Sequence, residues 1–204
     1  MTQPRQSAAE LLGLVERIVM PMCRIERTIA LPPPTSRREN DAEHSFGLTV
    51  LACSLAGRMD TRLNTGLIAE YATVHDVLEI YTGDLSVYQD TAAEQRAVTE
   101  GDALTLLTED FGASNPWLLE RVRDYLARKD DEGRFVYALD KMIPHAIVLL
   151  ANNHPLTPTW SEYLRTEAVA KSKIHASYPA LLPMFEEMCD MLATRPHVFR
   201  ADEA

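Results

Sequence analysis

The chain has few cysteines and few glycines for its length. Its 204 residues include three cysteines and eight glycines. The cysteines, Cys23, Cys53 and Cys189, stand far apart and form no CxxC pair, which argues against a disulfide framework and against a cysteine-rich zinc finger. We therefore expect three reduced thiols and a cytoplasmic protein. Eight glycines and twelve prolines also exclude a collagen-like or low-complexity architecture.

Basic charge and long apolar runs are lacking as well. With 30 acidic and 20 basic side chains, the formal net charge is -10, which argues against a nucleic-acid partner. A small phosphate is not excluded, because a metal ion or two arginines can reverse the charge locally. The apolar stretch 146–151 is far shorter than the ~20 residues that a bilayer requires. Glu10 and Glu16 interrupt the N-terminal segment, so we expect neither a signal peptide nor a membrane partner.

Nearly all of the chain carries helical spacing of its apolar residues. Asn40, followed three residues later by Glu43, has the pattern of a helix N-terminal capping box. Three prolines within 31–36 predict a surface loop, and no alternating pattern of convincing length predicts a strand. The expected helices cover residues 8–19, 40–59, 67–81, 91–111, 117–128, 133–152, 160–177 and 180–194. Together with the length, this pattern predicts one all-α domain over residues 1–204, a bundle of seven or eight helices.

Three polar residues interrupt apolar helix faces. His44 begins a stripe that contains Leu51, and His75 lies in the stripe that contains Tyr71. Asp140 lies in a stripe that ends at Leu150. A single histidine in such a place is more often a hydrogen-bonded core residue. A carboxylate on an apolar face, however, carries a desolvation penalty of several kcal/mol unless it meets a cation or hydrogen-bond donors. Local rules that fail together tend to mark a functional site.

More acidic residues follow His75. Asp76 is its neighbour, Glu79 would lie on the same side of a continuous helix, and Asp84 follows the helix end at Gly83. Two imidazoles and two carboxylates suit a single divalent ion such as Mn, Co, Ni, Fe, Zn or Mg. Water on such an ion becomes a nucleophile near neutral pH, and two further carboxylates can orient it and protonate a leaving oxygen.

Three segments resemble a known family. They are RRENDAEHS at 37–45, HDVLEIYTGD at 75–84 and ALDK at 138–141. These strings are similar, in the same order, to the motifs of HD-domain metal-dependent phosphohydrolases, and most of all to the bacterial 5'-deoxynucleotidases. The resemblance extends over about residues 8–180.

The resemblance implies roles for particular residues. The metal ligands would be His44, His75, Asp76 and Asp140. Glu79 and Asp84 would be the acids that handle the protons of the water and the leaving group, and Arg27 would meet the substrate phosphate. Lys141, next to Asp140, is a further candidate for neutralising substrate charge, and His145 is a weaker candidate for the surroundings of the metal. The family analogy also implies a homodimer.

The leading functional hypothesis is hydrolysis of (deoxy)nucleoside 5'-monophosphates by a metal-activated water. The first alternative is a deoxynucleoside triphosphohydrolase, which releases tripolyphosphate. The second is a nucleotide-binding regulatory module without activity. The regulatory alternative expects that some ligand or catalytic acid has been lost, whereas all six of those positions hold competent residues in this sequence.

Overall fold

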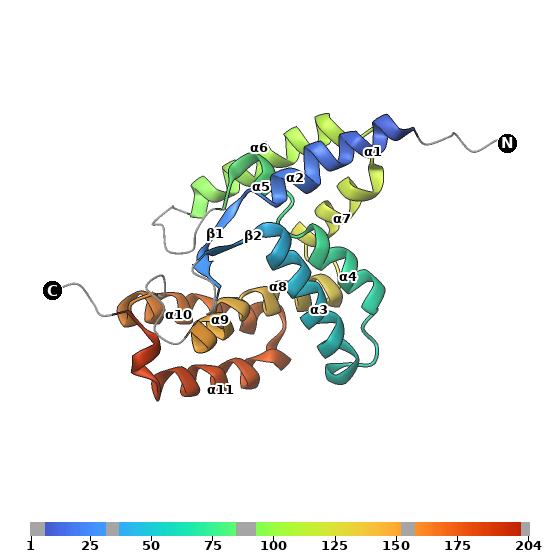
Figure 1. Cartoon of the computed structure of the whole chain (residues 1–204). Helices are drawn as coiled ribbons and strands as arrows, with labels where there is room; N and C mark the ends of the chain where they lie inside the picture. The colour runs from blue at the N-terminus through green and yellow to red at the C-terminus, as the bar shows by residue number, and fades with distance from the viewer. Residues whose placement is uncertain (1–6, 32–36, 85–92, 152–157, 201–204) are drawn as a thin grey trace.

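The computed structural model describes residues 7–31, 37–84, 93–151 and 158–200, and their fold is all-α, as expected (Figure 1). Within these residues, eight α-helices have nine or more residues. They are α3 (Asp41–Met59), α4 (Thr65–Val74), α6 (Ala93–Phe111), α7 (Pro116–Leu126), α8 (Asp131–Asp140), α9 (Ile143–Ala151), α10 (Trp160–Ser177) and α11 (Leu182–Ala193).

Shorter helical segments complete the chain. The expected N-terminal helix is present as α1 (Ala8–Leu14), a π-helical turn (Val15–Val19) and α2 (Met20–Met22). Helix α5 (Glu79–Thr82) ends at Gly83, and two 3-10 turns flank α11 at Pro179–Leu181 and Pro196–Val198. None of the described helices is long and apolar enough to span a bilayer.

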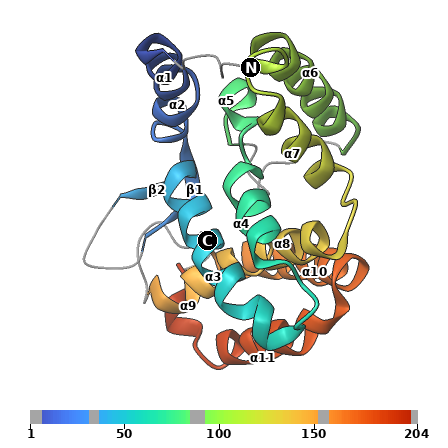
Figure 2. The ribbon, with the colours of Figure 1, turned by 90° about the vertical axis from the view of Figure 1, so that its right-hand side faces the viewer.

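The helices gather at two ends with α3 and α4 between them. Helices α1, α2, α5, α6 and α7 lie at one end, and α8 to α11 lie at the other (Figures 1 and 2). The main core joins α3, α4, α8, α10 and α11 around side chains such as Leu48, Tyr71 and Phe135, all fully buried. A second core packs the segment after α4 against α6 and α7. The segment between α4 and α5 therefore lies where the two cores meet.

Two strands were not expected from the sequence. Strand β1 (Glu26–Ala30) pairs antiparallel with β2 (Arg38–Asn40), with an irregularity between the two register pairs. The strands are too short to show an alternating pattern, so pairing with each other rather than periodicity defines them. Of the expected loop, Leu31 donates its N–H to the Arg37 carbonyl, and residues 32–36 lie outside the described part of the chain.

Two of the expected helices are each divided in the structure. The helix predicted over 67–81 is α4 followed by tight turns over 75–78 and then α5, because Val77, Glu79 and Tyr81 donate three rather than four residues back. The helix predicted over 133–152 is broken after Asp140, between α8 and α9. Both breaks fall at residues predicted to bind metal.

The capping box predicted at Asn40 is present. The Asn40 side chain accepts from the Glu43 N–H at 3.0 Å, and the Glu43 carboxylate accepts from the Asn40 N–H at 3.1 Å. These bonds fix the start of α3 one turn before His44.

Replacing Asn40 by Ala should lower the free energy of unfolding by about 1 kcal/mol. Urea unfolding measures the loss. Asn115 caps α7 in the same way, through the Leu118 N–H, away from His44. Asn115→Ala should therefore lose comparable stability without disturbing the site, whereas an Asn40→Ala protein of unchanged stability would show that the cap contributes nothing.

Candidate metal centre

Two histidines and an aspartate converge from three separate segments. His44 lies in the second turn of α3, His75 directly follows α4, and Asp140 is the last residue of α8. All three are buried, and one nitrogen or oxygen of each lies within 4.8 Å of the others. His44 Nε2 is 3.0 Å from Asp140 Oδ1, and His75 Nε2 is 3.9 Å from the same oxygen. The three polar residues that interrupt apolar helix faces in the sequence are thus neighbours in space.

The hydrogen bonding of His75 prepares it to bind a metal. Its Nδ1 lies 2.9 Å from the Ala72 carbonyl and can only donate to it, so Nε2 carries the lone pair when the ring is neutral, as a metal ligand must be. That Nε2 is buried and has no hydrogen-bond partner among the described residues, although Asp76 Oδ2 is only 2.9 Å away. A buried acceptor beside a carboxylate oxygen is expected where both face one cation. The residues present therefore fit a divalent ion.

Asp76 completes the four expected ligands and also binds Arg27. Its Oδ2 lies 3.9 Å from His44 Nε2 and accepts a hydrogen bond of 2.6 Å from the Arg27 guanidinium on β1. Burial acts to raise the pKa of Asp76, but the charges of His75 and Arg27 outweigh it and hold that pKa well below its usual range. Asp76 is thus ionised, as a metal ligand must be.

Asp140 and His44 form a charged pair with further support. Burial opposes ionisation of Asp140, but Lys141 and His44 keep its pKa well below the usual range. Lys141 Nζ lies 2.5 Å from Asp140 Oδ2. Burial lowers the pKa of His44, but its hydrogen bond to Asp140 and the carboxylate of Glu39 raise it to about 9. Without a cation, His44 therefore carries the positive charge that balances Asp140.

A second group of acids lies beside Arg27. Asp41, Asp76 and Glu79 have oxygens within 4.8 Å of one another, and Asp41 is fully buried. Burial and the negative charges of Asp76 and Asp41 raise the pKa of Glu79 to about 11. Burial and Asp76 raise the pKa of Asp41 to about 6. Glu79 therefore holds a proton at neutral pH in this state.

Asp84 is positioned by the β-hairpin. It follows Gly83, whose φ of 68° lies in the left-handed region that favours glycine and turns the chain sharply after α5. The Asp84 carboxylate accepts from the Thr28 N–H at 2.9 Å. Arg27 and Asp84 thus reach the site through one strand, which is why the two short strands matter for function.

These residues line a cavity of about 550 Å³. Its walls include His75, Asp76, Asp140, Glu79 and Asp84, together with Arg27 and Lys141. This volume is in the range of pockets that enclose small-molecule ligands. His145 also lines the cavity, but its ring packs on Tyr163 and Phe185, and it is not among the grouped ligands.

The structure brings all eight predicted site residues to this one place, but it corrects one geometric argument. Glu79 was expected to share a helix with His75, whereas it begins α5 after a break. The sequence interpretation missed Glu39, which lies 3.4 Å from His44 Nδ1, and the buried Asp41. Asp41 stands one helical turn before His44, so a buried acid at that spacing was the signal available for it.

A family model described as the HD domain matches residues 23–182, most of the chain. The chain belongs to the HD domain family. A solved structure of similar fold is that of a predicted metal-dependent phosphohydrolase from Magnetospirillum magnetotacticum MS-1, with a TM-score of 0.72 and 25% identity over 96% of this chain and 95% of that one. A conserved hypothetical protein from Pyrococcus furiosus shares the fold, with a TM-score of 0.58 and 20% identity over 90% and 99% of the two chains.

Two named relatives of this HD domain are mammalian. This chain is 28% identical to 5'-deoxynucleotidase HDDC2 of Homo sapiens over 129 residues. The aligned region covers 61% of this chain and 60% of that protein. This chain is also 28% identical over 139 residues to the Mus musculus protein of the same name, covering 66% of each. The matched region is thus less than two thirds of each relative's length.

Proposed function

We propose that this chain is a metal-dependent phosphohydrolase that releases phosphate from (deoxy)nucleoside 5'-monophosphates. The observation that carries the proposal is the group His44, His75 and Asp140, with Asp76 and Arg27 against it. All of these except His44 line a cavity large enough for a nucleotide. The names of the mammalian relatives and of the solved bacterial neighbour support the same reaction class.

The cation would be held by His44, His75, Asp76 and Asp140. A divalent ion there supplies Lewis-acid charge that activates water and polarises a phosphoryl group. Its identity is proposed only as one of Mn, Co, Ni, Fe, Zn or Mg, because nitrogen and oxygen donors suit all of them. Lys141 orients Asp140 through their 2.5 Å contact and adds positive charge beside the phosphate.

Arg27, Glu79 and Asp84 have the other roles in the proposed reaction. Arg27, held among Asp76, Asp41 and Glu39, presents a guanidinium to the charge that develops on the phosphoryl oxygens. Glu79, whose carboxylate lies beside Asp76 and Asp41, is suited to orient the attacking water and to accept its proton. Asp84, fixed by the Thr28 N–H, is placed to protonate the departing 5'-oxygen.

A triphosphohydrolase remains the alternative, because a metal ion on the same ligands can also activate water that attacks a nucleoside triphosphate and releases tripolyphosphate. The deciding experiment offers nucleoside mono- and triphosphates with each candidate metal and resolves the products. The proposal expects inorganic phosphate from 5'-monophosphates. Tripolyphosphate from triphosphates, with inert monophosphates, would establish the alternative, and metal-independent nucleotide binding without turnover would indicate the regulatory module.

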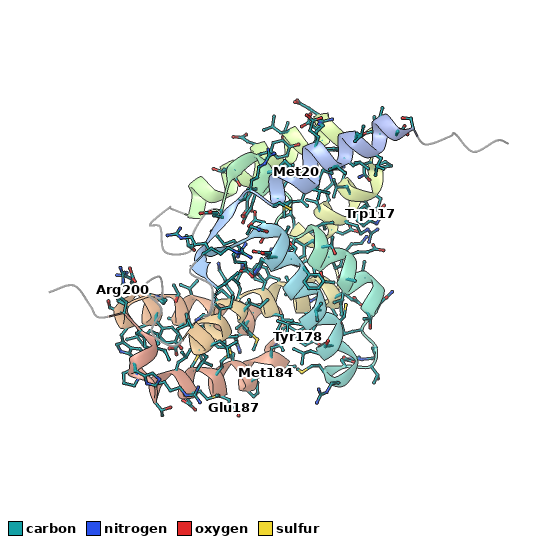
Figure 3. The ribbon with its side chains drawn as sticks, in the orientation of Figure 1. Met20, Trp117, Tyr178, Met184, Glu187 and Arg200 are labelled. Carbon is teal, nitrogen blue, oxygen red and sulfur yellow. The ribbon has the colours of Figure 1, made fainter. Side chains whose placement is uncertain are left out.

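We also propose a homodimer that forms through the N-terminal helix. Helix α1 has no buried residue, and its apolar side chains, continued through α2, face solvent: Leu11, Leu12, Leu14, Val15, Val19 and Met20. A row of exposed apolar side chains on one helix is typical of a protein interface. Met20 lies at the same end of the molecule as Trp117, which is also partly exposed, and far from Met184 on α11 (Figure 3).

Replacing Leu12 by Glu should therefore convert the dimer to a monomer, because it places a charge in the proposed apolar contact. Light scattering after size-exclusion chromatography measures the mass. Met191→Glu, on the exposed part of α11, is the matched control and should leave a dimer. A monomeric wild-type chain would contradict the proposal, and a dimer lost only in Met191→Glu would move the interface to α11.

Two expectations stay predictions. The first is the single-domain organisation over residues 1–204; the family model itself matches residues 23–182. The second is the cytoplasmic location expected from the cysteines.

A further inference from the structure

Basic residues other than those at the metal centre line the same cavity. Besides Arg27 and Lys141, its walls include Arg128 after α7 and two basic residues of α10, Arg165 and Lys173, and we call these three residues the far part of the cavity. Arg165 and Lys173 are eight residues apart on α10, so they fall on one helix face. Five basic side chains thus balance five acidic ones in the cavity wall, whereas the chain as a whole has a net charge of -10.

The two arginines of the far part, Arg128 and Arg165, differ in their ion pairs from the cations near the metal centre. Arg27 is ion-paired with Asp76, and Lys141 with Asp140. Within the described part of the chain, no carboxylate lies at ion-pair distance from Arg128 or Arg165. Four of the five acids in the cavity wall belong to the metal centre, and the fifth is Glu100. The charges of Arg128 and Arg165 are therefore available to a ligand.

The backbone at Arg128 gives independent evidence. Its φ is 47°, and it is the only residue other than glycine with positive φ among those described. It lies immediately after the C-cap of α7, where glycine is the usual residue, so the arginine holds a backbone conformation that is unfavourable for a residue with a Cβ atom. Strained residues of this kind cluster at ligand-binding sites.

The side chain of Arg128 is also held in place. Its guanidinium lies over the ring of Tyr137 at 3.8 Å and donates to the Leu126 carbonyl at 3.1 Å. Lys141 Nζ lies 5.0 Å from the centre of the same ring. The ring of Tyr137 therefore contacts two cations: Lys141, which is ion-paired with Asp140, and Arg128. A stacked guanidinium keeps its remaining N–H groups free for bidentate binding of phosphate.

We infer that the cavity binds a phosphomonoester that carries a second phosphate group, and that Arg128, with Arg165, binds this second phosphate while the first lies at the metal centre. The inference rests on the proposed function for the position of the first phosphate. It narrows the substrate class to nucleotides with two phosphates, either on one chain or at two positions of the sugar.

The test compares a nucleoside 5'-monophosphate, a 5'-diphosphate and a 3',5'-bisphosphate as substrates of the metal-loaded protein. One of the doubly phosphorylated compounds should have a KM lower by about tenfold or more, because hydrogen bonds between charged groups are strong. Arg128→Gly should remove this advantage and leave the KM of the monophosphate within about twofold. Arg165→Gln should reduce the advantage in the same direction, and Arg123→Gln, outside the cavity, should not change it.

Glycine accepts the backbone conformation at position 128 without strain, and this offsets the loss of the Arg128 contacts with Tyr137 and the Leu126 carbonyl. Arg128→Gly should therefore unfold close to the temperature of the wild type. An Arg128→Gly protein of lower stability with equal loss of affinity for all three compounds would show that Arg128 only caps α7, and would overturn the inference.

Direct binding separates this inference from the proposed function. Calorimetry with Glu79→Gln, expected to keep the metal ligands without turnover, measures the affinities of the same three compounds. Tighter binding of a doubly phosphorylated compound that depends on Arg128 would support the inference even if the wild type hydrolyses none of them. Equal binding of all three would overturn it even if monophosphates are hydrolysed.

Discussion

Replacing Asp140 by Asn should reduce phosphate release at least about a thousandfold and abolish stoichiometric metal binding. The substitution removes the negative charge that pairs with His44 at 3.0 Å and with Lys141 at 2.5 Å, so the site would lose one of its two anionic ligands while Lys141 keeps its positive charge beside it. A dication is held far more weakly by a ligand that has lost its charge, and an unbalanced cation nearby repels it. Metal content by atomic emission and phosphate release by a coupled assay measure the two effects.

His175→Gln is the matched control for this experiment, with His75→Gln as the second test variant. His175 is exposed on α10, whereas His75 presents a buried Nε2 to the proposed ion. His75→Gln should behave like Asp140→Asn, and His175→Gln like the wild type. Full metal content in both His75→Gln and Asp140→Asn would show that the ion, if any, binds elsewhere.

Replacing Arg27 by Gln should lower kcat by about a hundredfold to a thousandfold and leave the metal bound. Loss of one fixed charge that stabilises a developing oxyanion has an effect of this size. Arg27→Lys should recover only part of the loss, because an ammonium cannot donate in the planar, bidentate way of a guanidinium. Steady-state kinetics with the best nucleotide and metal measure kcat and KM separately.

The control for Arg27 is Arg62, an exposed arginine that pairs with Asp60 at 2.6 Å away from the cavity. Arg62→Gln should have wild-type kinetics. If Arg27→Gln lost its metal together with its activity, Arg27 would act by supporting Asp76, to which it is hydrogen-bonded at 2.6 Å, rather than by contacting the phosphate.

Most helices could be predicted because their signals are local. The capping box of α3 and the apolar spacing along α10 each depend on residues within a few turns. The break after Val74 could not be predicted, because no proline or glycine marks it. The break after Asp140 had a signal that the sequence interpretation missed, because Pro144 is the second residue of α9. The breaks also change which residues are buried: Leu150 was expected in one stripe with Asp140, but α9 begins a new phase and leaves Leu150 exposed. Leu51 is exposed because the buried row of α3 is Leu48, Ala52 and Ala56.

The site was easier to predict than the elements that carry it. His44, His75 and Asp140 were conspicuous because each places a polar group on an apolar face, where burial without a partner is unfavourable. Glu39 and the Thr28 N–H were missed because they reach the site through β1 and β2. Those strands are defined by their pairing with each other. Strands as short as these carry no periodic signal in the sequence that would predict the pairing.

The most direct test of the metal centre is a crystal soaked in manganese, examined by anomalous diffraction. The account predicts one anomalous peak, with Nε2 of His44 and His75 and an oxygen of Asp140 at about 2.0–2.2 Å, and with Asp76 turned toward the same ion. A map without a peak among these side chains, at a manganese concentration that supports phosphate release, would contradict it.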